Sequence, residues 1–360
     1  MKLLVIMKRF GANKDMVVEN FGRQIRLFEP LAKKHKIDFF CPDYKKRESR
    51  VISRKGIRYI VSPVSLISPL TLEKSLGKLV KKEGYDVIIA TTDPLIGILG
   101  HRLSKKFRIP FVYELQDNFE SYDSYKLPFV KHLDRKAIME ADIVIVVSHS
   151  LKKHISKLRK KPVYVINNGI DLGLFKMISK SIARKKLKLP LKPKIIAYIG
   201  NIDRLRGGKI LINAFNKVRE KYPDAYLLLS GNIDKSINLR KKNIIFRKFP
   251  KREEVVLGIN SADVAVLPNP VNKFTKYSFP YKLAEYMACN VPIVATDVGD
   301  VSLILGKYDG SLCKPNSDSL AEKIIAKLEK PGKASYHNDI IKLQWKVLSA
   351  NLGRILRSLK

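Results

Sequence analysis

Apolar residues gather in short runs along this chain, separated by stretches of mixed polarity. In the first half, runs of about five residues lie at 3–7, 37–41, 57–61, 86–90, 110–115 and 142–147. Between the first two runs, across 17–34, the apolar residues Phe21, Ile25, Phe28 and Leu31 recur every three or four positions, which predicts a helix. Apolar runs that alternate with helices are typical of strands buried on both faces. The pattern therefore predicts a parallel sheet covered by helices on both sides.

The same alternation starts again in the second half, after a basic stretch at 176–194. Further strands are predicted at 195–199, 225–230, 244–246 and 263–267, with helices at 208–221 and 251–261. Pro190 and Pro193 interrupt the basic stretch and predict a break between two domains. We expect a first α/β domain over 1–172, a linker over 173–193, a second α/β domain over 194–334 and a C-terminal amphipathic helix over 335–360.

Composition places the chain among ordinary globular proteins. Its 360 residues suit two domains, and an apolar fraction of 45% excludes disorder as a description of the whole chain. Cys41, Cys289 and Cys313 lack metal-ligand spacing and are odd in number, which favours buried thiols in a reducing compartment. No apolar run reaches the ~18 residues of a membrane-spanning helix, and the apolar start at 1–7 is too short for a signal peptide. We expect a cytoplasmic protein.

The charge is strongly positive, because 70 Lys and Arg residues stand against 33 Asp and Glu residues, a net charge of +37. The excess is spread over both halves, so it raises the affinity for polyanions in general. Basic residues are not interleaved with aromatic ones as in nucleic-acid-binding modules, so no specific nucleic acid is expected as a partner. An anionic membrane is the stronger candidate, since each Lys or Arg near its headgroups contributes ~1 kcal/mol; this would place the protein peripherally on the inner face. The alternative is that the lysines only keep the protein soluble.

The segment 278–300 combines a loop, a short helix, a turn and a buried strand. Pro280 is suited to the first turn of a helix, where its missing N–H costs nothing, and an apolar stripe comes after it. Glu285 lies in the middle of this helix between apolar neighbours. It is either a solvated surface carboxylate or an acceptor for the hydroxyl groups of a ligand. In the second case, the free N–H groups at 279–282 would face an anion.

Glycine and polar residues lie directly after other predicted strands. Gly200 comes after the strand at 195–199 and before a helix, so a phosphate could approach its backbone closely. Arg204, Arg206 and Lys209 lie nearby, and Arg offers a diphosphate two parallel N–H donors; the alternative is that they are ordinary surface cations. Asp117 comes after the strand at 110–115 and is expected at the ligand-binding edge of the sheet, unless it only caps a helix.

Several of these motifs resemble one enzyme family when taken together. Pro280-x-Lys282-x-x-Glu285-Tyr-Met-Ala288, with 292–299 after it, looks like the donor-site signature of the family 4 (group 1) retaining glycosyltransferases with the GT-B fold. Ser148, the turn at 168–171, Phe175 and the motifs at 198–200 and 204–207 have the order and spacing of that family. Over roughly 130–300 the resemblance extends to individual motifs. Over the first 120 residues only the predicted architecture is similar. It implies two Rossmann-like domains that face each other across a cleft, with the last helix crossing back to the first domain.

The resemblance also implies a role for each matching residue. In the family, the helix glutamate binds the ribose of a nucleotide-sugar, cations hold the diphosphate, and the backbone before the helix holds the sugar. The donor-binding residues implied here are Gly11, Gly200, Arg204, Arg206, Ser230, Gly231, Phe279, Pro280, Tyr281, Lys282, Leu283 and Glu285. The residues implied in catalysis are Glu285, Arg206, Lys282 and Asp117. Many members carry a second glutamate eight positions earlier and an arginine directly after the strand-end glycine, where this chain has Tyr277 and Asn201.

The implied activity is transfer of a sugar from a nucleoside diphosphate sugar, with UDP or GDP as the nucleotide, to a glycan acceptor with retention of configuration. The acceptor would be lipid-linked or membrane-bound and would contact the aromatic-rich segment at 119–129. No cofactor, metal ion or protein nucleophile is implied, and the six histidines show no zinc-type spacing. Two alternatives stay open: a nucleotide-sugar epimerase of the same fold, which the tyrosine at 277 would fit, and a non-catalytic protein that binds anionic surfaces.

Overall fold

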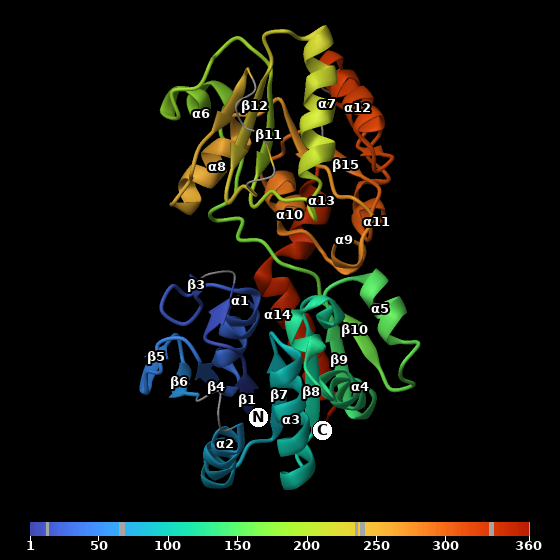
Figure 1. Ribbon diagram of the computed structural model, residues 1–360. Helices are drawn as coiled ribbons and strands as arrows, with labels where there is room; N and C mark the ends of the chain where they lie inside the picture. Colours follow the sequence, from blue (N-terminus) through green and yellow to red (C-terminus); the bar gives the residue numbers. More distant parts are fainter. Residues whose placement is uncertain (12–13, 65–68, 235–236, 238–241, 331–334, 360) are drawn as a thin grey trace. The chain divides into compact units, whose positions relative to one another are not determined.

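The computed structural model describes residues 1–11, 14–64, 69–234, 237, 242–330 and 335–359, and it divides into two compact units (Figure 1). Unit 1 comprises Met1–Asn167 together with Trp345–Lys360, and unit 2 comprises Asn168–Gln344. Each unit is an α/β domain with a parallel sheet, which confirms the predicted fold class.

Unit 1 is built on an eight-stranded sheet, counted over the described residues. In spatial order its strands are β10 (Val163–Val165), β9 (Ile143–Val146), β8 (Phe111–Leu115), β7 (Val87–Thr91), β1 (Lys2–Ile6), β4 (Lys36–Asp43), β6 (Ile57–Pro63) and β5 (Arg50–Arg54). The neighbouring strands pair in parallel, apart from the antiparallel pair of β5 and β6. A small hairpin of β2 (Phe10–Gly11) and β3 (Lys14–Asp15) comes after β1. The central strands are apolar and buried, as the sequence predicts.

Helices cover the sheet of unit 1 (Figure 1). They are α1 (Arg23–Phe28), η1 (Glu29–Lys33), α2 (Pro69–Glu83), α3 (Pro94–Phe107), η2 (Phe119–Ser121), η3 (Asp123–Lys126), α4 (Val130–Glu140), α5 (His149–Ile155) and α14 (Trp345–Arg357). The helix predicted across 17–34 is wrong in its bounds. It begins only at Arg23, after the positive-φ Gly22, and continues as a 3₁₀ segment from Glu29 because Pro30 has no backbone N–H to donate.

The C-terminal helix α14 belongs to unit 1, as predicted, but the bounds expected for it, 335–360, are wrong. It begins only at Trp345, and 337–343 forms two short helical segments of unit 2. Helix α14 contacts α1 and η1, and Leu348, Leu352 and Leu356 are buried in the same core as the strands of unit 1. Gly353 lets the helix approach closely, since a Cβ there would lie 3.1 Å from Cδ2 of Leu31. The amphipathic pattern of the tail therefore reflects burial of its apolar face against the first domain.

Unit 2 contains a six-stranded sheet over its described residues. Its strands, in spatial order, are β13 (Ile244–Phe246), β12 (Tyr226–Ser230), β11 (Ile195–Ile199), β14 (Val264–Leu267), β15 (Ile293–Thr296) and β16 (Leu312–Cys313). Its helices are α6 (Lys180–Lys186), α7 (Gly208–Lys221), α8 (Arg252–Asn260), α9 (Lys273–Tyr277), α10 (Tyr281–Ala288), α11 (Val301–Leu305), α12 (Ser317–Glu329), α13 (His337–Ile340) and η4 (Ile341–Leu343). In Figure 1, α7 and α12 lie side by side against the sheet.

The stretch expected as a linker, 173–193, lies within unit 2. Its α6 is anchored by Arg184, whose side chain is only 3% exposed. The Arg184 guanidinium donates to the carbonyl of Ser261 at 2.8 Å and to the carboxylate of Asp263 at 2.6 Å. The stretch at 173–193 thus packs against unit 2, although it is basic and contains prolines, because Arg184 binds buried acceptors there.

Candidate functional site

Two strands of unit 2 end side by side at glycines. Gly200 comes directly after β11 and has φ 140°, and Gly231 comes directly after β12 and has φ 106°. The N–H of Gly200 donates to the carbonyl of the buried Ser230 at 2.8 Å, so the two strand ends are joined. A Cβ on Gly231 would lie 2.4 Å from the carbonyl carbon of Gly200. Glycine is therefore required here both by the backbone conformation and by the close approach of the two chains.

Lys282 extends across the first of these glycines. A Cβ on Gly200 would lie 2.3 Å from Cε of Lys282 and 3.0 Å from its Nζ. The ammonium also lies over the ring of Tyr198, 5.0 Å from the centroid, and the hydroxyl of Tyr198 donates to the carbonyl of Asn201 at 2.7 Å. The Lys282 cation is thus held against the exposed backbone at the end of β11.

The helix that carries Lys282 is fixed to the same strand end by Tyr286. The hydroxyl of Tyr286 accepts the N–H of Ile199 at 3.0 Å, and burial raises the pKa of this phenol well above 10. Pro280 lies at the N-cap of α10 with φ −72° and ψ 122°, one position earlier than the first helical turn predicted from sequence. The N–H of Leu283 donates to the Pro280 carbonyl at 3.1 Å, and the side chain of Leu283 is fully buried in the core.

The segment just before α10 is held by a residue of the turn at 168–171. The side-chain amide of Asn168 donates to the carbonyl of Phe279 at 2.7 Å in a buried position. The ring of Phe279 is itself buried, whereas Tyr281 is 43% exposed. Two motifs that lie about a hundred residues apart in the chain are therefore in direct contact, and this contact sets the path of the backbone into α10.

Glu285 lies one turn after Lys282 on α10. Its side chain is 17% exposed, and its Oε1 is 3.8 Å from a guanidinium nitrogen of Arg252. Burial raises the pKa of the Glu285 carboxyl above its usual 4.5, and the positive charges of Arg252 and Lys282 oppose this shift. The solvated surface position considered from sequence does not describe this carboxylate, which is largely shielded from solvent.

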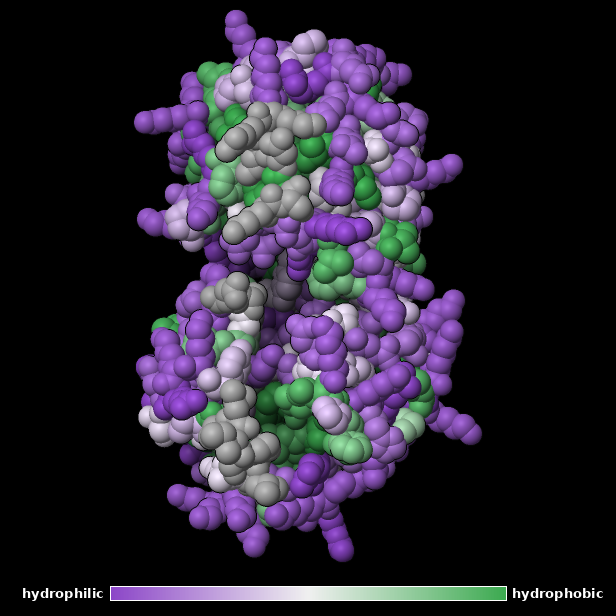
Figure 2. All heavy atoms as spheres, viewed as in Figure 1, coloured by the Kyte–Doolittle hydropathy of each residue, from purple (hydrophilic) through white to green (hydrophobic). Residues whose placement is uncertain are grey.

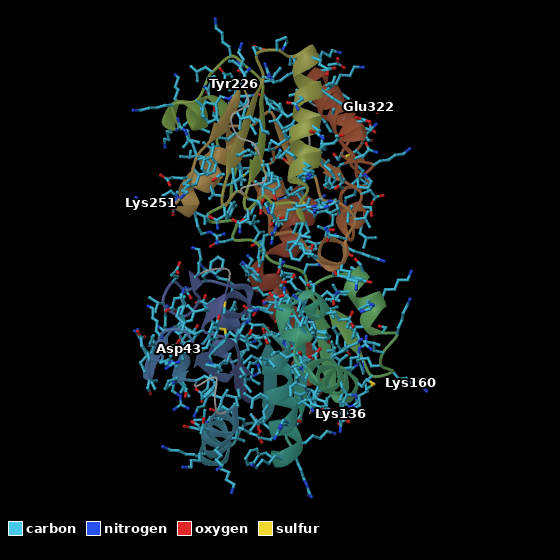
Figure 3. All side chains as sticks on the ribbon, in the orientation of Figure 1. Asp43, Lys136, Lys160, Tyr226, Lys251 and Glu322 are labelled. Atoms are coloured by element: carbon cyan, nitrogen blue, oxygen red, sulfur yellow. The ribbon has the colours of Figure 1, made fainter. Side chains whose placement is uncertain are left out.

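Arg252 was missed in the sequence analysis. It is the first residue of α8, whose N-cap Lys251 is labelled in Figure 3, and its guanidinium lies 5.1 Å from the centroid of the Phe175 ring. Its proximity to Glu285 depends on the packing of α8 and α10, which are in contact. No local pattern distinguishes Arg252 from the other basic residues of the chain, although the neighbouring Phe175 matches the pattern of the family.

The arginines after Gly200 occupy a loop that is tied to α9. Arg206 is paired with Asp203, which also accepts the Arg206 N–H at 2.8 Å, and its guanidinium lies 4.7 Å from the centroid of the Phe274 ring. The side-chain amide of Asn272 donates to the carbonyl of Leu205 at 2.9 Å. Arg204 is exposed. Arg206 is thus paired with a carboxylate of its own loop, and this partner was not predicted from the sequence.

The two remaining candidates lie in unit 1. Gly11 ends β2, where a Cβ would lie 3.0 Å from Sδ of Met16. Asp117 comes after β8 and accepts a hydrogen bond from the hydroxyl of Tyr122 at 3.1 Å. The cap of the next 3₁₀ helix is Asn118, not Asp117, because the Asn118 side chain accepts the N–H of Glu120. Gly200, Gly231, Lys282 and Glu285 therefore lie together in unit 2, whereas Gly11 and Asp117 belong to unit 1.

The described residues contain no group of three or more His, Cys, Asp or Glu side chains that could hold a metal ion. Within the same ranges, the three cysteines are free and buried, and burial raises the pKa of Cys289 to about 12. No helix in the described part of the chain is both long enough and apolar enough to cross a membrane.

Comparisons with known proteins cover both units. The family described as "Glycosyl transferases group 1" matches residues 179–342, and the family described as "Glycosyltransferase Family 4" matches residues 25–174. TuaC of Bacillus subtilis (strain 168), whose name describes a teichuronic acid biosynthesis glycosyltransferase, is 32% identical over 228 residues, 62% of this chain and 56% of TuaC. The N-acetyl-alpha-D-glucosaminyl L-malate synthase of Bacillus anthracis is 27% identical over 199 residues, 52% of this chain and 50% of the synthase. The chain thus spans about half the length of the curated relatives it matches.

Solved structures match over nearly the whole chain. The sucrose-phosphate synthase of Thermosynechococcus elongatus has a TM-score of 0.78 at 20% identity and covers 99% of this chain and 98% of its own. Anabaena HepE, solved in complex with UDP, has a TM-score of 0.77 at 18% identity and covers 99% of this chain and 100% of its own. At these identities the structures establish the fold, and the two family matches establish the relationship. The chain belongs to the group 1, family 4 glycosyltransferases and has their GT-B fold.

Proposed function

We propose that the chain is a retaining glycosyltransferase that moves a sugar from a nucleoside diphosphate sugar to a glycan acceptor. One observation carries the proposal: the Lys282 ammonium lies over Gly200 where β11 ends, and Glu285 lies one helical turn later. This places a cation, accessible backbone and a carboxylate at the carboxyl edge of a parallel sheet, where such sheets bind their ligands. UDP and UDP-glucose bound to Anabaena HepE support UDP as the nucleotide, with GDP as the second choice.

The roles are derived from the chemistry of the donor. As the glycosidic bond breaks, negative charge grows on the departing diphosphate, so a fixed ammonium and the N-terminus of α10 would stabilise the transition state. Lys282 and the backbone at Gly200 would hold the diphosphate, and Glu285 would accept the ribose hydroxyls. The backbone of Phe279, Pro280 and Tyr281 would hold the sugar, with Ser230 and Gly231 next to the base or ribose.

Retention would result from reaction on the donor's own face. The acceptor oxygen would form its bond to the anomeric carbon on the side from which the phosphate oxygen leaves, and that oxygen would take the acceptor's proton. No side chain of the protein becomes covalently bonded in this scheme. Gly11 and Asp117 of unit 1 remain predictions, as residues that would border the phosphates and the reacting sugar.

The acceptor is proposed to be a lipid-linked or membrane-bound glycan, reached from the cytoplasm at an anionic membrane surface. The net charge of +37 supports this assignment. The name of the relative TuaC, which refers to teichuronic acid biosynthesis, supports a glycan as the acceptor. An epimerase of the same fold is the second candidate, because Tyr277 stands where many relatives carry a glutamate. Incubation of a labelled UDP-sugar without acceptor would give an epimeric product in that case alone.

The proposal is tested by thermal unfolding in the presence of UDP-, GDP- and ADP-sugars. A bound donor stabilises the folded state by mass action, by about 2.7 kcal/mol at a hundredfold excess over Kd, so UDP-glucose should raise the Tm. Lys282→Gln and Glu285→Gln should weaken donor binding at least tenfold, since each removes a charge-assisted hydrogen bond of roughly 1.5–3 kcal/mol. Glu253→Gln on the exposed start of α8 is the matched control. The proposal fails if no nucleotide-sugar shifts the Tm, or if Glu285→Gln binds the donor like the unchanged protein.

A further inference from the structure

Unit 1 exposes a group of large apolar side chains that its core does not use. Leu95 lies in the first turn of α3 and is 45% exposed, and Leu133 on α4 is 39% exposed. Leu127 and Phe129 lie between η3 and α4 and are 51% and 79% exposed. We call these four residues the apolar tip. The elements that carry them are in contact, since α3 touches both η3 and α4. Figure 2 shows hydrophobic side chains gathered on the face of unit 1 on which α3 lies.

The backbone at the centre of the apolar tip is strained. Phe129 has φ 62° and ψ −14°, a left-handed conformation that is uncommon for a bulky residue. It occupies the N-cap of α4 without making a side-chain cap, and its ring packs into no core because it is mostly exposed. Strain and exposure of an aromatic side chain both cost stability, so a purely structural role does not account for them.

The apolar tip rests on a firm base. The hydroxyl of Tyr125 in η3 donates to the carboxylate of Asp134 in α4 at 2.5 Å, and Tyr113 of β8 donates to the same carboxylate. The N–H of Leu133 donates to the carbonyl of Phe129 at 2.9 Å, and Val130 between them is buried. The exposed side chains are therefore presented by backbone that is tied to the core of unit 1.

Cations surround the apolar tip. The side chain of Lys126 is 81% exposed and pairs with Asp123, and Lys131 is exposed. Lys136 projects from α4 with 51% of its side chain exposed and lies 4.0 Å from the carboxylate of Glu140 (Figure 3). Apolar side chains that enter the boundary between headgroups and acyl chains, with Lys side chains at the level of the phosphates, are the typical composition of a membrane-binding surface.

We propose that the apolar tip and its surrounding lysines dock unit 1 on an anionic lipid bilayer. A second copy of the chain fits this surface poorly, because two molecules of net charge +37 would repel each other there. A nucleic acid would engage the cations but would leave the leucine side chains without an apolar partner. The inference rests on the proposed function for its purpose, since a docked unit 1 would meet a membrane-bound acceptor, but bilayer binding itself can be measured without any sugar transfer.

The test is co-sedimentation with vesicles of phosphatidylcholine, with and without phosphatidylglycerol. Leu127→Ser/Phe129→Ser should reduce binding to the anionic vesicles roughly tenfold or more, because two large apolar side chains no longer enter the interface. Leu303→Ser/Phe246→Ser changes the same residue types at exposed positions of unit 2 and should leave binding unchanged. Equal binding by the tip variant and this control would overturn the proposal.

The charge contribution is tested in the same assay. In Lys126→Gln/Lys131→Gln the affinity for anionic vesicles should fall roughly fivefold for each lysine removed. Added salt should weaken the binding of the unchanged protein to these vesicles. Lys185→Gln/Lys186→Gln removes the same charge from exposed positions of α6 and should lose clearly less. If both pairs lose affinity equally, the net charge acts without a specific surface and the proposal is wrong. Concentration-dependent dimerisation that is lost in the tip variant would instead identify a second copy as the partner.

Donor binding separates this proposal from the proposed function. The Tm of the tip variant without ligand checks that it is folded, and its Tm shift with UDP-glucose should equal that of the unchanged protein. A protein that shows the donor shift but binds no vesicles would refute the docking surface alone. A protein that binds vesicles through the apolar tip but shows no donor shift would refute the proposed function alone.

Discussion

The carboxyl edges of the two parallel sheets differ in the residues at which their strands end. In unit 2, β11 and β12 end at Gly200 and Gly231, both with positive φ, and a lysine lies over the first of them. In unit 1, β7 ends at Thr91, and the next residue is Thr92, a β-branched residue with φ 79°. The strands of the two sheets thus end differently: at glycines in unit 2, and at residues with polar side chains in unit 1.

The side chains at the edge of unit 1 bind one another. Lys8 pairs with Asp93 at 2.8 Å and donates its N–H to the hydroxyl of Thr92 at 3.0 Å. Glu114 at the end of β8 accepts from Arg23 at 2.5 Å, and both side chains are buried. Glycines at a strand end let an anion approach the backbone without a Cβ in the way, and β11 and β12 of unit 2 both end at such residues. The edge of unit 1 is instead stabilised by internal polar contacts, so different substitutions should damage the two units.

Arg23→Met is expected to have the largest effect on stability. The Arg23 guanidinium donates to Glu114 and to the carbonyls of Ile166 and Asn167, the latter two at 2.8 Å. Its removal leaves a buried carboxylate without its cation, which costs about 3–5 kcal/mol in the free energy of unfolding. Urea unfolding measures this loss. Arg50→Met, at an arginine whose side chain is 47% exposed, should cost less than about 1 kcal/mol, and a similar loss in both variants would contradict the assigned role.

Gly231→Ala tests the carboxyl edge of the sheet in unit 2. It should lower the free energy of unfolding by roughly 2–4 kcal/mol. The new Cβ would lie 2.4 Å from the backbone of Gly200 in a left-handed conformation, so overpacking and backbone strain add together. Gly84→Ala is the matched control in unit 1, because its φ is 63° but nothing lies within 4 Å of the new methyl group. It should lose only about 1 kcal/mol. Donor-induced stabilisation should disappear in Gly231→Ala alone; an equal loss of stability in both variants would show that the close approach is not tight.

The sequence predicted the parts of both units that depend on local pattern. The apolar runs indicated the central strands, and Pro280 with the stripe after it indicated α10, which begins one residue later than expected. Contacts between distant segments were not predictable in this way. The proximity of Arg252 to Glu285, for example, results from the packing of two helices. The pairing of Arg206 with Asp203 is local, but it depends on the conformation of a loop that has no periodic pattern. The amino-acid sequence alone contains no pattern that predicts either contact.

Asp134→Asn should change how the stability of unit 1 depends on pH. Burial raises the pKa of the Asp134 carboxyl to about 6, against the opposing effect of the hydrogen bonds from Tyr113 and Tyr125. Since the folded state then binds the proton more tightly than the unfolded state, this group stabilises the fold at low pH. That contribution, on the order of 3 kcal/mol, is lost as the pH rises from about 4 to about 6. Tm measured against pH should fall less steeply over this range in the variant; identical slopes would show that Asp134 does not titrate there.

Arg206→Lys is expected to have the smallest effect on stability. It tests whether the loop of unit 2 that carries Arg206 contributes to donor binding. The pair with Asp203 is about 30% exposed, so the substitution should change the stability by less than about 0.5 kcal/mol. If Arg206 exchanges Asp203 for the diphosphate, the lysine keeps the charge but loses the forked donor, and donor affinity should fall roughly three- to tenfold. Asp203→Asn should then tighten donor binding, because the competing carboxylate is gone. Arg50→Lys, at an arginine of unit 1 whose side chain is 47% exposed, should leave donor binding unchanged. Unchanged affinity in all three variants would assign the diphosphate to Lys282 and the glycine backbone, and would leave Arg206 as a contact between its loop and Phe274.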